Sequence, residues 1–77
     1  MNQMKLTLHY DKKGDLLELG IGEIRESYYD ETEDGIFEGR DKKTNKITGF
    51  KIMNFTKKTQ NFKPIEIETS EKQTVEH

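Results

Sequence analysis

Apolar and polar residues alternate along most of the chain, and short runs of turn residues separate the alternating stretches. In the first stretch, Met4, Leu6, Leu8 and Tyr10 fall on one face. Alternation with a period of two is typical of strands in an antiparallel sheet that has one buried face. The expected strands are residues 4–10, 16–21, 24–29, 36–40 and 47–54. The pattern therefore predicts a mainly β fold, a small antiparallel meander sheet of about five strands.

Three polar segments are expected to form the turns between these strands. They are residues 11–15, 30–35 and 41–46. In the first segment Gly14 is the residue that can adopt a positive φ, and the second ends in Asp34-Gly35, a strong turn dipeptide. Gly20 and Gly22 predict a bulge or bend at the end of the second strand.

The segment after the last strand is compatible with a short C-terminal helix at residues 56–62. Thr56 is a suitable N-cap residue, and Phe55 and Phe62 are seven residues apart, which would place them on one helix face. Pro64 would end such a helix. A helix here would add a minor α component to the predicted β fold.

The end of the chain carries weaker signals. Residues 65–67 alternate isoleucine with glutamate, which predicts a brief edge strand. Residues 69–77 contain one valine and no other aliphatic side chain, so we expect a flexible tail. The sequence therefore predicts one small antiparallel-sheet domain over residues 1–68 and no second domain.

Apolar side chains occupy both faces of the fifth expected strand. Phe50 and Ile52 fall on one face, and Ile47, Met53 and Phe55 fall on the other. Such a strand is typically covered on two sides, either by a C-terminal element or by another subunit.

Material for a core is scarce in this chain. Leu, Ile, Val and Phe supply 17 of the 77 residues, about 22%, just above the level of roughly 20% below which highly charged chains stay disordered. A second copy or another protein would provide the missing burial. We therefore expect a homodimer or a module that binds a protein partner, without catalytic activity. The predicted partner-binding residues are Phe50, Ile52, Phe55 and Phe62.

Charged residues are numerous and unevenly distributed. The chain has a net charge of −2, but residues 40–63 carry eight basic side chains and one acidic one. A cross-strand pair between Glu38 and Lys51 would neutralise part of this charge. The alternative function is nucleic-acid binding by the Lys/Phe-rich segment 50–63, in which bases stack on phenylalanine rings beside lysines. The lysines for this alternative are Lys51, Lys57, Lys58 and Lys63.

Other classes of chemistry have little support. The chain has no cysteine, which excludes disulfides and thiolate metal sites and favours the cytoplasm. No apolar run is long enough for a membrane span or a signal peptide. His9 has no visible nucleophile partner, so we expect no enzyme and no cofactor. Residues 30–41 match part of a calcium loop, but the expected strand at 36–40 argues against it, and no metal is expected.

Three separate pieces of the sequence carry a resemblance to a known family. They are Tyr10-Asp11 followed by Asp15, Leu17 and Leu19, then Asp34-Gly35-Ile36, then Ile47-Thr48-Gly49-Phe50-Lys51-Ile52. In their order and spacing they resemble the domain of unknown function 2283 family of short bacterial and archaeal proteins. The match covers about residues 8–57. The resemblance implies a compact antiparallel sheet and a partner-binding or antitoxin-like role.

The chain departs from the family pattern at three positions. Glu18 stands where tyrosine is usual, Lys51 replaces the usual glutamate, and Asn45 replaces the turn glycine of the last hairpin. Asparagine can adopt the left-handed conformation. Asp11 and Asp15 match the family, and we expect both carboxylates to accept backbone N–H groups in the first hairpin turn.

Overall fold

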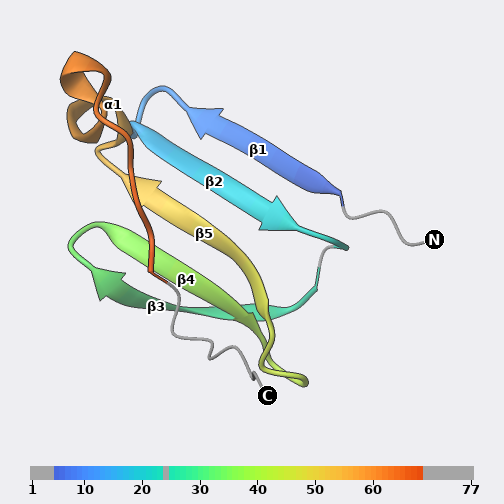
Figure 1. Ribbon diagram of the computed structural model, residues 1–77. Helices are drawn as coiled ribbons and strands as arrows, with labels where there is room; N and C mark the ends of the chain where they lie inside the picture. The colour runs from blue at the N-terminus through green and yellow to red at the C-terminus, as the bar shows by residue number, and fades with distance from the viewer. Residues whose placement is uncertain (1–4, 24, 69–77) are drawn as a thin grey trace, which may run out of the picture.

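A computed structural model describes residues 5–23 and 25–68 of the chain (Figure 1). The strands are β1 (Leu6–Asp11), β2 (Leu16–Ile21), β3 (Ser27–Glu33), β4 (Ile36–Asp41) and β5 (Ile47–Met53). A short helix α1 (Phe55–Lys58) and a 3-10 turn η1 (Gln60–Phe62) follow the last strand. All strand pairs are antiparallel. The predicted mainly β fold with five strands is therefore confirmed. Met4, Ile24 and the predicted tail at 69–77 lie outside the described residues.

The strands form one sheet in the order β1-β2-β5-β4-β3. This order differs from the simple meander that the sequence predicted, because β3 does not pair with β2. The chain passes from one side of β5 to the other between β2 and β3, and β5 then inserts between β2 and β4 (Figure 1). In this central position Phe50 and Ile52 of β5 are buried.

The third strand is also displaced from its predicted position. It was expected at residues 24–29 with a long turn at 30–35, but β3 continues to Glu33 and the turn contains only Asp34 and Gly35. This strand tolerates a run of polar residues because it is an edge strand whose residues are nearly all exposed. Polar composition therefore concealed the second half of the strand.

The core lies at the centre of the sheet, on β4 and β5. Ile36, Phe50 and Ile52 are buried. The register places Ile52 between Leu17 of β2 and Ile36 of β4, and places Phe50 opposite Leu19. Directly paired residues point to the same face of a sheet, so these side chains form one apolar layer.

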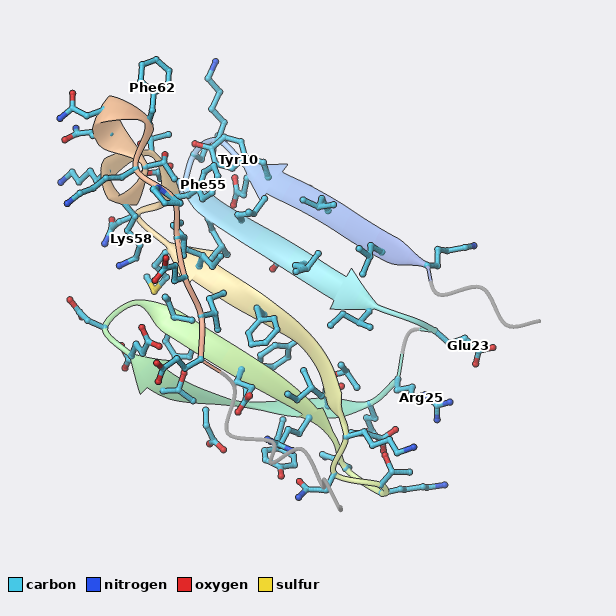
Figure 2. The ribbon with its side chains drawn as sticks, viewed as in Figure 1. Tyr10, Glu23, Arg25, Phe55, Lys58 and Phe62 are labelled. Atoms are coloured by element: carbon cyan, nitrogen blue, oxygen red, sulfur yellow. The ribbon has the colours of Figure 1, made fainter. Side chains whose placement is uncertain are left out.

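The segment after β5 differs from the predicted helix. The chain turns at Asn54, where φ is 56°, and α1 ends at Lys58. Asn61 and Phe62 then have φ values of 61° and 60°, which interrupt the helical geometry. Phe55 and Phe62 therefore do not share a helix face: Figure 2 shows Phe62 pointing away from the sheet, whereas Phe55 packs against Tyr10 with ring centroids 5.9 Å apart.

Two smaller expectations about the chain's turns and C-terminal region were wrong. Residues 65–67 form no strand, although Ile65 and Ile67 are half-buried. In the first turn Asp15, with φ 53°, takes the left-handed conformation that was expected at Gly14. Aspartate is one of the few residues besides glycine that adopt this conformation, and the Asp15 side chain is held by hydrogen bonds from Tyr10 and Thr56.

Candidate functional site

The two most exposed apolar side chains of the sheet, Leu6 and Leu8, lie on its first strand, together with the exposed Tyr10. The exposed fractions are 59% for Leu6, 64% for Leu8 and 40% for Tyr10. All three alternate on one face of β1, and every residue of β1 is exposed. Large apolar side chains gathered on one face of an edge strand typically mark an interaction site.

The apolar residues of β2 extend this exposed strip. The register pairs Leu6 with Ile21, Leu8 with Leu19 and Tyr10 with Leu17, and the three β2 side chains are half-buried. We call these side chains the β1–β2 apolar surface. It comprises Leu6, Leu8, Tyr10, Leu17, Leu19 and Ile21.

Local sequence and sheet order together produce this surface. The apolar residues of β1 alternate as regularly as those at the centre of the sheet. However, β1 lies along the edge of the sheet, and β2 is its one strand neighbour among the described residues. Figure 1 shows β1 along the margin of the sheet, while α1 lies near one end of β2 and β5. The surface is therefore anchored at the Tyr10 end and open along Leu6 and Leu8.

A hydrogen-bonded cluster fixes the Tyr10 end. The Tyr10 hydroxyl donates to the Asp15 carboxylate at 2.7 Å, which also accepts the Thr56 N–H at 3.0 Å and the Thr56 hydroxyl at 2.7 Å. Asp15 thereby supplies the cap that Asn54 does not give to α1. The bond from Tyr10, followed by those from Thr56, lowers the pKa of Asp15, and the same bond to Asp15 raises the pKa of Tyr10.

The two aspartates of the family resemblance therefore have different roles. Asp11 accepts the Lys13 N–H at 3.1 Å, as predicted for a turn residue. Asp15 accepts its backbone N–H from Thr56, on α1, and the expected bond within the turn is replaced by this long-range contact. Asp15 thus ties the first hairpin to the C-terminal segment.

The structure places the four predicted partner-binding residues in different environments. Phe50 and Ile52 are buried in the core, Phe55 is half-buried against Tyr10, and Phe62 is fully exposed. They do not form one surface. Sequence reasoning missed Leu6 and Leu8, although their alternation together with the scarcity of core residues was the available signal.

The opposite face of the sheet has a hollow of about 340 Å³ whose lining includes the charged side chains of Glu18 and Lys51. The Glu18 carboxylate lies 3.8 Å from Nδ1 of His9 and 3.9 Å from Nζ of Lys51. Nζ of Lys51 also lies 4.4 Å from the ring centroid of Tyr29. The predicted pair of Glu38 with Lys51 is therefore wrong, because Lys51 is opposite Phe37 in the register. These two residues point to opposite faces of the sheet.

Glu38 has a different partner on the core face. Its carboxylate lies 3.5 Å from Nε of Arg40, and both side chains are largely covered. Glu38 is opposite Phe50 in the register. The pair therefore places a charged contact beside the apolar core.

Glycines from three neighbouring strands lie side by side on the face of the sheet opposite the core. Gly20, Gly49 and Gly39 are aligned by the register of β2, β5 and β4. A Cβ at Gly39 would lie 2.5 Å from the Tyr29 ring, and a Cβ at Gly49 would collide with the Leu19 carbonyl oxygen. At Gly20 a Cβ would make only ordinary contacts. Close packing therefore requires glycine at two of the three positions.

The lysines of the nucleic-acid alternative are dispersed. Lys51 lies in the hollow on β5, whereas Lys57 and Lys58 lie on α1 and Lys63 follows η1. Phe50, the first aromatic residue of the segment, is buried and cannot stack on a base. Nucleic-acid binding stays a prediction, because the described lysines and phenylalanines of this segment do not form one exposed surface for stacking bases.

The described part of the chain contains no group of side chains arranged for a metal ion. Within residues 5–23 and 25–68, no three histidine or carboxylate side chains gather into a metal site. The calcium-loop match falls on the β3–β4 hairpin, and Asp41 is occupied by the N–H groups of Lys43 and Thr44 at 2.6 and 3.2 Å. No helix in these ranges is long and apolar enough to cross a membrane.

Comparisons with known proteins add no assignment. No family model matches the chain, and no curated protein or solved structure matches it. The resemblance to the domain of unknown function 2283 family therefore stays a prediction.

Proposed function

We propose that this chain is a non-catalytic protein-interaction module that binds its partner through the β1–β2 apolar surface. The observation that carries the proposal is the exposure of Leu6 and Leu8, at 59% and 64%. These side chains alternate on one face like core residues. Burying each one fully would contribute about 1.5–3 kcal/mol of transfer free energy.

The chemistry of the surface favours protein over nucleic acid. Its members are leucines, an isoleucine and a tyrosine, and apolar contacts with a single polar handle are typical of the cores of protein interfaces. Phosphate binding requires clustered cations, and the lysines of segment 50–63 are spread over a strand, a helix and the segment after η1. An antitoxin-like role in the cytoplasm stays an expectation, which the family resemblance and the lack of cysteine motivate.

Site-specific photo-cross-linking would test the proposal. A photoreactive amino acid replaces Leu8 in the full chain expressed in a bacterial host, and a matched variant carries it at Thr32 on the exposed edge strand β3. We expect a cross-linked protein species from position 8 and none from position 32. Added salt should lower the yield only slightly, because apolar contacts are not screened.

The outcomes separate the two functions. No cross-link from position 8, or equal yields from both positions, would refute binding through the β1–β2 apolar surface. Cross-linking of the Leu8 variant to nucleic acid, suppressed by salt, would instead favour the alternative.

A further inference from the structure

We propose that the partner is a second copy of this chain and that the two copies join through antiparallel pairing of their β1 strands, with a two-fold axis beside Leu8. The result is one sheet of ten strands, five from each copy. This inference rests on the proposed function and goes beyond it by naming the partner and the register. It depends on three properties of β1: its free backbone groups, the symmetry of its sequence and its charges.

The first property is the direction of the backbone groups. The Lys5 carbonyl points toward β2, because it accepts the Gly22 N–H at 2.8 Å. Successive residues of an antiparallel strand alternate in this direction. The N–H and C=O groups of Leu6, Leu8 and Tyr10 therefore point to the open edge. Within the described residues, β1 pairs only with β2, so these groups form an unused row of donors and acceptors.

The second property is self-complementarity about Leu8. When two β1 strands pair with Leu8 of one copy opposite Leu8 of the other, Leu6 lies opposite Tyr10 and Thr7 opposite His9. The outward groups of Leu6, Leu8 and Tyr10 then all find partners, and the apolar side chains meet on one face. An interface of this kind is isologous, and it closes at two copies.

The third property is charge. In the same register Lys5 lies opposite Asp11 of the other copy, and this pair occurs twice. No like charges are paired between residues 5 and 11. A register centred on Tyr10 would instead place Leu8 opposite Lys12, a turn residue. The register centred on Leu8 therefore gives the outward backbone groups hydrogen-bond partners, brings the apolar side chains together on one face and pairs opposite charges.

The decisive experiment is sedimentation equilibrium of the purified full chain and of two variants. Leu8→Lys places two like charges face to face at the two-fold axis and removes two leucines from the interface, so we expect dimerisation to weaken about 100-fold or more. Phe62→Lys alters a more exposed apolar side chain that belongs to η1 and not to β1, and should leave dimerisation unchanged. Thermal unfolding checks that both variants fold.

Amide hydrogen exchange distinguishes edge pairing from stacking of two apolar faces. In the dimer we expect slow exchange at Leu6, Leu8 and Tyr10. In Leu8→Lys, the amides of positions 6 and 10 should become fast, while those of Thr7 and His9 stay protected by β2. Dimerisation without protection of the outward amides would overturn the edge-pairing inference.

A charge exchange tests the register. Lys5→Glu and Asp11→Lys should each weaken its own homodimer by about three- to tenfold, because each places like charges opposite each other. An equimolar mixture should form heterodimers, since both cross-strand pairs are then of opposite charge. Failure of the mixture to restore association would overturn the register.

The failures of the two proposals are distinguishable. A wild-type chain that stays monomeric at high micromolar concentration would overturn the second-copy inference. If position 8 then cross-links to a different protein, the β1–β2 apolar surface still functions as a contact site. If it cross-links to nothing, both proposals fail.

Discussion

Strands β1 and β4 each contain six residues, but they differ in how far those residues are buried. Four of the six residues of β4 are buried, whereas all six residues of β1 are exposed. The difference arises from position in the sheet: β4 lies between β3 and β5, and β1 has one strand neighbour among the described residues. The position of a strand in the sheet, more than its apolar content, therefore decides whether its residues are buried within the chain.

The largest expected effect concerns the buried side of this comparison. Ile52→Ala removes a buried side chain between Leu17 and Ile36, and should lower the free energy of unfolding by about 2–5 kcal/mol. Urea denaturation measures the loss. Leu8→Ala, the matched variant on β1, should cost less than about 1 kcal/mol at low protein concentration and more at high concentration, where the dimer forms. Equal losses of unfolding free energy for Ile52→Ala and Leu8→Ala at low protein concentration would show that Leu8 is buried within the chain as Ile52 is.

The next effect concerns the covered charge pair of β4. Glu38→Ala leaves the Arg40 guanidinium without this carboxylate at 3.5 Å, and should lower the free energy of unfolding by about 2–4 kcal/mol. The exposed pair of Glu18 with Lys51 at 3.9 Å provides the control, because Glu18→Ala should cost less than about 1 kcal/mol. Chemical denaturation of both variants tests this ranking, which would be wrong if Glu18→Ala were the more costly change.

Two glycines on the face opposite the core, Gly49 of β5 and Gly20 of β2, test how closely the inner strands pack. Gly49→Ala places a methyl group against the Leu19 carbonyl and should lower the free energy of unfolding by about 1–3 kcal/mol. Gly20→Ala makes ordinary contacts and should stabilise the chain by about 0.5 kcal/mol, because alanine restricts the unfolded chain. Midpoints of thermal unfolding should move in opposite directions. Equal shifts would show that strand β2 does not approach β5 as closely as described.

The fold was predictable where periodicity and turn chemistry agreed. Alternation located β2, β4 and β5 within one or two residues, and Asp34-Gly35 marked a turn that the structure contains. The strand order was not predictable from local patterns. It depends on which strands supply enough apolar surface for the centre, and that is a property of the whole sheet.

The sequence predicted that the chain has an interaction surface, but not which residues form it. Scarcity of core residues, together with apolar side chains on both faces of residues 47–55, indicates an interaction surface that contains Phe50 and Ile52. Both are buried, because β5 lies at the centre of the sheet. Leu6 and Leu8 became the exposed residues because β1 is at the edge, which no local pattern reveals.

The smallest effect concerns the anchor of the β1–β2 apolar surface and depends on pH. The Asp15 carboxylate has a lowered pKa because it accepts hydrogen bonds from Tyr10 and Thr56. Its contribution to stability is therefore fully present above the pKa of an unfolded aspartate, about 3.9, and is lost as the pH falls through the lower folded pKa. Asp15→Asn and Tyr10→Phe should both destabilise the chain at neutral pH.

The acid range then separates this anchor from the rest of the molecule. Asp41 also has a lowered pKa, chiefly from the Lys43 N–H, so all variants should lose stability as the pH falls below about 4, the pKa of an unfolded aspartate. Wild type should lose more than Asp15→Asn, because only wild type titrates at position 15. Urea midpoints at pH 7 and pH 3 measure the difference. Parallel losses in both proteins would show that Asp15 is not the ionised acceptor joining the first hairpin to α1, and the Tyr10 end of the surface would then lack its anchor.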